Sequence, residues 1–118
     1  MRWGVLTGPR GLRLAVEICE SPAERRRGLL GRDRLEPGTG LLIPGARSVH
    51  TIGMRFPLLV AFLDGRLVVR RIGLMRPGRL ALPRLGVRHV LELADRGPDD
   101  TNPRAGDRLR LERGAARS

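Results

Sequence analysis

The segment SVHTIGM, Ser48 to Met54, holds the densest group of reactive side chains in the sequence. It offers two hydroxyls, an imidazole and a thioether, from Ser48, Thr51, His50 and Met54. Side chains of these types can serve nucleophilic catalysis, metal binding or ligand binding, depending on which of them share a face of the chain. The segment is therefore the first candidate for a functional site.

The spacing within this segment disfavours catalysis and metal binding. On a regular strand, His50 and Met54 would share a face but lie about 13 Å apart, too far for one ion unless Gly53 folds the chain. His50 and Thr51 are neighbours and would face opposite ways, so the imidazole is poorly placed to activate that hydroxyl. The sequence also has no C-x-x-C or H-x-x-x-H pair and no Gly-x-Ser-x-Gly elbow. We therefore expect no catalytic residue, no metal site and no cofactor.

The carboxylate of Glu92 is a second candidate, because it interrupts the apolar strand VLEL. Alternation along a strand turns it away from the face of Leu91 and Leu93, and a buried carboxylate needs a partner or a proton. It could form a structural ion pair with Arg32 or Arg55, or it could line a ligand pocket. We expect such a pocket where the HTIGM bend meets the VLEL strand and the end of a helix, with the ligand-binding candidates Ser48, His50, Thr51, Met54, Arg55 and Glu92.

The charge of the chain raises polyanion binding as another possibility. The net formal charge is +11, and all 23 basic residues are arginines spread over the whole length. The only aromatic residues are Trp3, Phe56 and Phe62, so there is no row of stacking platforms for a nucleic-acid single strand. An arginine run can hold phosphate, but it is also typical of the solvated side of an amphipathic helix. We expect only non-specific binding of nucleic acid, with the polyanion-binding candidates Arg25, Arg26, Arg27 and Arg32.

Length and composition bound the class of protein. A chain of 118 residues can bury one hydrophobic core but not two, so we expect a single β-rich domain over residues 1–112 and a disordered, arginine-rich tail over 113–118. The single Cys19 can form no internal disulfide. No stretch has the length of a membrane span or of a secretory signal. The sequence therefore predicts a soluble, cytoplasmic protein with no membrane partner. It does not determine the oligomeric state.

Strand patterns dominate the elements that would position these residues. Alternating apolar residues around Trp3 and over residues 12–18 predict a β-hairpin. Ser21 and Glu24 then form an S-x-x-E capping box, which predicts one short α-helix near residues 22–31. The hairpin and the helix occupy roughly the first quarter of the sequence.

Short strands follow in the rest of the chain. TGLLIPG and ARSVHTIG each predict a strand, the second bent at Gly53, and Phe56 to Leu63 is apolar enough to be covered on both faces. Asp64-Gly65 favours a type I′ turn into a strand over Leu67 to Ile72. RLALPRLG predicts a loop with one irregular strand, and His89 to Leu93 and Leu109 to Leu111 predict the last strands. The fold class is mainly β: a small single-domain β-sandwich or barrel of about eight short strands, closed around the 56–63 strand as its innermost one.

Motifs in a fixed order connect these elements to a known family. They are S-x-x-E-R-x-x-G-L-x-x-R from Ser21 to Arg32, G-L-L at Gly40, H-T-x-x-M-x-x-P-L from His50 to Leu58, F-L-D-G from Phe62, V-L-E-L from Val90, and Gly106-Asp107. With this order and spacing, the chain resembles the bacterial and archaeal "domain of unknown function 192" family over residues 12–111. The resemblance implies a compact, mainly β fold with one short helix. It implies no reaction, because the family has no established activity.

Two positions depart from the pattern of that family. Leu59 stands where the family commonly has an acidic residue after Pro-Leu, so any chemistry of that carboxylate would be missing here. The sequence Ala-Asp-Arg-Gly after Leu93 replaces a turn of the Pro-Ala-Gly type. We interpret the chain as a binding or accessory module for a small ligand or a protein partner. The alternatives are a polyanion binder that uses the arginine-rich helix and an enzyme with a site around His50 and Glu92.

Overall fold

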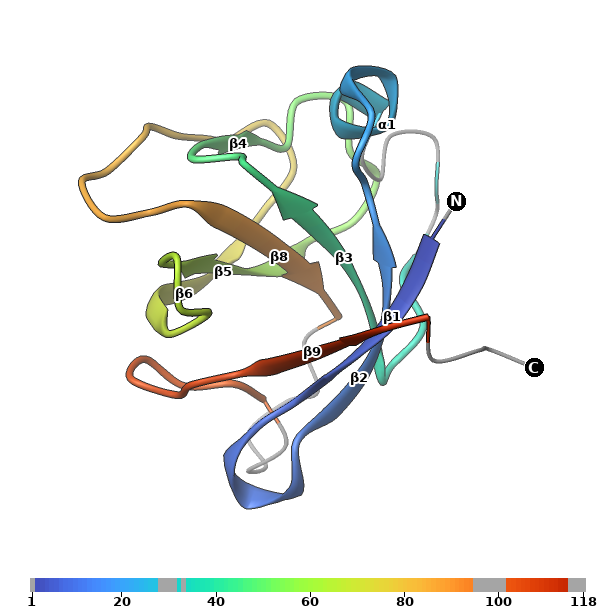
Figure 1. Cartoon of the computed structure of the whole chain (residues 1–118). Helices are drawn as coiled ribbons and strands as arrows, with labels where there is room; N and C mark the ends of the chain where they lie inside the picture. Colours follow the sequence, from blue (N-terminus) through green and yellow to red (C-terminus); the bar gives the residue numbers. More distant parts are fainter. Residues whose placement is uncertain (1, 28–31, 33, 95–101, 115–118) are drawn as a thin grey trace.

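A seven-stranded sheet forms the framework of the structure (Figure 1). The computed structural model describes residues 2–27, 32, 34–94 and 102–114. In spatial order the strands of the sheet are β6 (Val69–Met75), β5 (Leu58–Leu63), β8 (His89–Leu93), β3 (Thr39–Pro44), β2 (Arg13–Ile18), β1 (Arg2–Thr7) and β9 (Arg110–Arg113). A separate two-stranded ribbon pairs β4 (Val49–His50) with β7 (Leu80–Ala81), and the helical segments are α1 (Pro22–Arg27) and a 3₁₀ turn at Pro9–Gly11.

The predicted fold class is confirmed. The described residues are mainly β, with nine strands where about eight were expected and with one short α-helix. The hairpin of β1 and β2 pairs in antiparallel register, and the strand over His89–Leu93 has the predicted bounds. β9 extends to Arg113, one residue into the segment expected as a tail, and residues 115–118 lie outside the described part of the chain. No helix among the described residues is long and apolar enough to span a membrane.

The order of strands corrects one prediction. β2 and β3 pair in parallel, which requires a crossover connection, and the chain between these two strands includes α1. The crossover places β3 in the middle of the sheet, and β5 is only the second strand from the β6 edge. The prediction that the 56–63 segment forms the innermost strand is therefore wrong, since sequence order does not show where a crossover strand inserts.

The sheet is also not a closed barrel. Its two ends meet at one corner, through a single bridge between Val68 and Arg108. Backbone hydrogen bonds support that corner, including Val69 N–H to Asp107 C=O at 2.8 Å and Leu109 N–H to Leu67 C=O at 2.9 Å. Beyond this corner, β6 has β5 as its one strand neighbour in the described part of the chain. β6 is therefore an edge strand over most of its length.

Two apolar clusters lie on the two faces of the sheet. One packs Leu14, Leu42, Leu63 and Leu91 together, and the other contains Leu41, Val60, Phe62 and Val90. The second cluster also includes Val49 of β4 and packs against Ala81 of β7, so the β4–β7 ribbon covers part of that face in a sandwich-like layer. β5 is buried at every position except Leu59, which confirms that this strand is covered on both faces.

The capping box at the start of α1 is confirmed. The Glu24 N–H donates to Ser21 Oγ at 3.1 Å, and the Ser21 N–H donates to the Glu24 carboxylate at 3.1 Å. These reciprocal bonds satisfy two backbone donors that the helix itself cannot. The helix is described as far as Arg27, and the rest of its predicted range, residues 28–31, lies outside the described residues.

The turn between β5 and β6 differs from the prediction of a type I′ turn. The Leu67 N–H donates to the Asp64 C=O at 3.0 Å, and Leu67, not Gly65, takes a left-handed φ of 62°. The Asp64 carboxylate accepts the N–H groups of Arg66 at 2.8 Å and Val68 at 3.0 Å. This side-chain capping favours a longer turn than the Asp-Gly dipeptide alone would form. Asp64 therefore starts the turn and is not one of its central residues.

Candidate binding groove

The central hydroxyl of the HTIGM segment is part of the structural framework. Thr51 is fully buried, and its Oγ1 donates to the Arg76 C=O at 2.6 Å and accepts the Arg79 N–H at 2.8 Å. Its backbone N–H donates to the Arg79 C=O at 2.7 Å, and its C=O accepts the Gly78 N–H at 2.9 Å. These bonds tie the end of β4 to the loop before β7. The Thr51 hydroxyl is therefore occupied and does not face a ligand.

The six ligand-binding candidates differ in their surroundings, since Thr51, Met54 and Glu92 are buried. Gly53 has a φ of 85°, and this bend turns the Met54 side chain into the apolar cluster of Val49 and Leu58. The predicted bend at Gly53 is thus confirmed, but Met54 fills the core and does not wall a cavity. The remaining polar candidates of the segment are exposed to solvent: Ser48, His50 and Arg55.

Glu92 lies inside the sheet, with Leu41 of β3 and Val60 of β5 directly opposite. Only 4% of the residue is exposed, and its Oε1 has no hydrogen-bond partner among the residues that the structure describes. Burial raises the pKa of the Glu92 carboxyl to about 7, because desolvation penalises the charged form. Of the two arginines considered as partners of Glu92, Arg32 is engaged elsewhere, since its guanidinium donates to the Glu17 carboxylate at 2.8 Å.

Glu17 and Glu92 share a face of the sheet with a buried thiol. Both glutamates lie directly opposite Leu41, so their side chains point to the same side, about 10 Å apart across β3. Burial, together with the nearby charges of Glu24, Glu17 and Glu92, raises the pKa of the Cys19 thiol to about 11. A thiol with this pKa stays protonated at neutral pH and is a poor nucleophile. The arrangement therefore does not form a reactive cysteine site.

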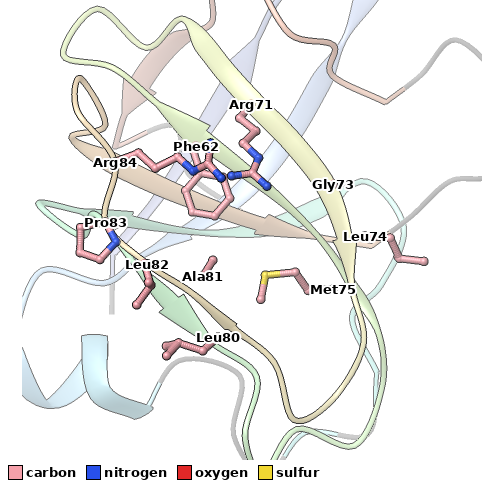
Figure 2. Close-up of a pocket in the computed structure, with 10 residues that line it drawn as sticks. All are labelled: Phe62, Arg71, Gly73, Leu74, Met75, Leu80, Ala81, Leu82, Pro83 and Arg84. Carbon is pink, nitrogen blue, oxygen red and sulfur yellow. The ribbon is translucent and has the colours of Figure 1, made fainter.

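An open groove instead lies between β6 and the segment that contains β7. We call it the β6–β7 groove, and its volume is about 580 Å³. Figure 2 shows the residues that line it: Phe62, Arg71, Gly73, Leu74, Met75, Leu80, Ala81, Leu82, Pro83 and Arg84. Leu80 and Leu82 of this lining are 62% and 68% exposed, and Leu74, 51% exposed, points away from the other lining side chains in Figure 2. Such a gathering of exposed large apolar side chains is typical of an interaction site.

Two arginines give the β6–β7 groove a positive charge. Arg71 lies on β6 opposite Phe62 of β5, and Arg84 follows Pro83 in the chain after β7. In the view of Figure 2, both guanidinium groups lie near the Phe62 ring. Neither group forms an ion pair with an acidic residue in the described ranges. An anion in the groove would therefore meet two available cationic donors.

Gly73 leaves room at the middle of the groove. It lies on β6 opposite Val60, and its φ is outside the left-handed region. A Cβ atom built at this position would meet no atom within 4 Å. The backbone therefore does not require glycine here, and glycine on an edge strand is often found where a ligand or another backbone approaches closely.

The β6–β7 groove is not evident in the sequence. Its residues come from separate segments, 62, 71–75 and 80–84, which the fold brings together. One signal was present: Leu80, Leu82 and Leu85 place apolar side chains in a loop rich in arginine and proline. All three are largely exposed, and Leu85 reaches 99%. The irregular strand predicted in this loop is confirmed as β7.

Three of the four polyanion-binding candidates lie in α1. Arg25, Arg26 and Arg27 belong to the backbone of α1, and their side chains are outside the described part of the structure. Arg32 is described, and its guanidinium is engaged with Glu17. These observations leave the arginine-rich helix as an untested prediction.

The fold and the groove define a small, mainly β protein built on one curved mixed sheet. The chain belongs to the DUF192 family, described as "Uncharacterized ACR", whose profile matches residues 5–111. The resemblance drawn from the sequence motifs is thereby confirmed. A comparison with curated proteins finds no match to this chain.

Two crystal structures share this fold. The first is a protein of Sinorhizobium meliloti 1021, described provisionally as a transcription regulator; it is 27% identical, with a TM-score of 0.77, and the match covers 93% of this chain and 92% of that one. The second is a protein of unknown function from Novosphingobium aromaticivorans DSM 12444, 22% identical, with a TM-score of 0.71, covering 92% and 83%. At 22% identity, the second comparison supports the fold alone.

Proposed function

We propose that this protein is a binding module whose β6–β7 groove takes a ligand with an apolar body and a negatively charged group. The observation that carries this proposal is the combination of exposed leucines with two arginines that have no acidic partner in the described chain. Apolar surface supplies affinity through burial, and a few charged groups fix the orientation of a ligand. The net charge of +11 would also attract anionic ligands from a distance.

The groove has the size and the chemistry for this role. A volume of about 580 Å³ is within the range of ligand pockets, which is roughly 300–1,000 Å³. Phe62 is nearly buried and forms an apolar wall, whereas Leu80 and Leu82 on the opposite side remain accessible. A carboxylate could accept hydrogen bonds from Arg71 and Arg84 while its apolar chain lies along the leucines. The site around His50 and Glu92 lacks this combination, because His50 is exposed and Glu92 is buried.

Calorimetric titration with decanoate tests the proposal, since this probe has one carboxylate and one apolar chain. Gly73→Leu should fill the groove and weaken binding at least about tenfold, because the added side chain enters open space without a backbone clash. Gly65→Leu is the matched control, since its Cβ would also meet open surface, 3.8 Å from the nearest atom, but in the β5–β6 turn. Equal binding by both variants would refute the groove as the site.

A second pair of variants tests how much the arginine charge contributes to decanoate binding. Arg71→Ala should weaken decanoate binding and leave binding of decanol almost unchanged, because only the acid uses the guanidinium. Arg13→Ala removes an exposed arginine from β2, four strands away from β6 in the spatial order β6-β5-β8-β3-β2, and controls for net charge. If both variants weaken decanoate binding equally, the attraction is general and not specific to the groove.

Nucleic-acid binding is a second candidate function. The net charge of +11 and the likeness to a Sinorhizobium protein described provisionally as a transcription regulator both support it. It predicts affinity for duplex DNA that survives about 0.2 M salt and depends on sequence, whereas general attraction would be lost steeply with salt. Fluorescence anisotropy with random and selected duplexes separates these outcomes.

A further inference from the structure

The free side of β6 adjoins the β6–β7 groove. β6 pairs with β5 from Leu58 to Leu63, and its start is joined to the chain before β9 through the Val68–Arg108 bridge. Along the rest of β6, no further strand pairs with it in the ranges that the structure describes. An edge strand of this kind presents unpaired backbone N–H and C=O groups that another strand can bind.

Only the first half of this edge carries the features that usually prevent strand addition. The register of β5 and β6 shifts between Phe62 and Leu63, and the charged Arg70 and Arg71 follow directly on β6. Irregular pairing and charge both discourage another strand from pairing. The second half reads Ile-Gly-Leu-Met, Ile72 to Met75, with no charge, no proline and an exposed Leu74. Strand addition is therefore unopposed beside the open part of the groove.

Alternation along β6 relates this edge to the groove lining. Arg71, Gly73 and Met75 stand at alternate positions, and all of them line the groove. A strand added beside β6 would project its own alternate side chains, about 7 Å apart, to the same side. One of these would lie near Arg71 and Arg84, and the next would enter the space beside Gly73. An acidic residue followed two positions later by an apolar residue suits these surroundings.

We propose that β6 binds an extended segment of a partner protein as an additional strand, with an acidic side chain toward Arg71 and Arg84 and apolar side chains toward Leu80 and Leu82. This inference rests on the proposed function and specifies its ligand as a peptide. Strand addition combines main-chain hydrogen bonds with pockets for alternate side chains, and the β6 edge and the groove together offer both. A second copy of this chain fits less well, because it would add Arg70, Arg71 and a net charge of +11 to a positive surface.

Selection from displayed peptides tests the chemistry of the partner. The library holds heptapeptides in which Val, Ile, Leu or Phe alternates with Asp, Glu or Thr, and a second library has Lys and Arg in place of the acidic residues. The full-length protein should enrich peptides from the acidic library, with counter-selection on Gly73→Leu. The Gly65→Leu variant should bind the selected peptides as the wild type does. No enrichment, or equal enrichment of the basic library, would overturn the inference.

Backbone methylation of the best peptide tests strand addition itself. Because alternate N–H groups of an added strand point to β6, methylation at positions of one parity should weaken binding at least about tenfold, and methylation at the other parity should not. If methylation at no position weakens binding, the peptide is held by its side chains alone, and strand addition is overturned. Binding of decanoate without any peptide binding would overturn this inference and leave the proposed function intact, whereas loss of both would refute both. Light scattering tests whether a second copy of this chain occupies the β6 edge. A wild-type dimer that dissociates on the Gly73→Leu substitution would show this and would overturn the proposal of a separate partner protein.

Discussion

Replacing Glu92 by glutamine should change how stability depends on pH. Glu92 is 4% exposed between Leu41 and Val60, and burial raises the pKa of its carboxyl from 4.5 to about 7. The folded state therefore binds a proton more tightly than the unfolded state does. Stability from this group is fully present below pH 4.5, is lost as the pH rises toward 7 and is constant above that value.

The size of the effect follows from the same two values. A change of one pKa unit corresponds to about 1.4 kcal/mol, so the rise from 4.5 to about 7 amounts to about 3 kcal/mol of lost stability at alkaline pH. Glu92→Gln keeps the shape of the protonated side chain and cannot ionise. We expect the variant to be within about 1 kcal/mol of the wild type at pH 5 and to be about 2–3 kcal/mol more stable at pH 8.

Urea unfolding at pH 5, 6, 7 and 8, followed by circular dichroism, measures this difference. Groups common to both proteins cancel in the subtraction, including His89, whose pKa burial lowers. Glu112→Gln is the control, since it removes one exposed carboxylate from β9 without emptying a buried site. A difference between wild type and Glu92→Gln that stays constant from pH 5 to 8 would refute the reasoning, because the carboxyl would then not titrate in the folded protein at these values.

Three further predictions concern the framework and the charge. Thr51→Val should lower the free energy of unfolding by about 2 kcal/mol, because it removes a buried hydroxyl with donor and acceptor bonds; a change below about 0.5 kcal/mol in urea unfolding would contradict this role. Ser21→Ala should lower it by about 1 kcal/mol, and Ser21→Asp should restore most of the loss if Oγ acts as the helix cap. Neutralising Arg25, Arg26 and Arg27 should make the salt dependence of duplex DNA binding shallower by about two to three counterions; an unchanged slope in anisotropy titrations would place that attraction elsewhere.

The local elements could be predicted from the sequence because their causes lie within a few residues of one another. The alternation over residues 12–18 and the Ser21–Glu24 capping box each act through direct chain neighbours. The turn at Asp64 was predicted wrongly for a related reason. The dipeptide Asp-Gly favours a two-residue turn, but the Asp64 carboxylate binds the N–H of Val68, four residues away, and lengthens it. A side chain that reaches past the dipeptide decided the conformation.

Partners far apart in the sequence could not be assigned in the same way. The sequence offered Glu92 a possible partner in Arg32, but the Arg32 guanidinium donates to the Glu17 carboxylate on β2. The position of β3 depends on a crossover that no local pattern shows. The family resemblance added the order of motifs and the fold, but it added no residue of the β6–β7 groove beyond Phe62.

The proposed site lies away from the reactive side chains that already serve the fold. Thr51 is used by the loop before β7, and Cys19 is held protonated by burial and nearby carboxylates. Such groups stabilise or fill the fold and have no capacity left for a ligand. Arg71 and the free edge of β6 differ, because their charge and backbone groups lack partners in the described chain while exposed leucines lie beside them. A folded chain tolerates unpartnered polar groups beside exposed apolar side chains chiefly where function requires them. This favours binding at the groove over catalysis at the HTIGM bend.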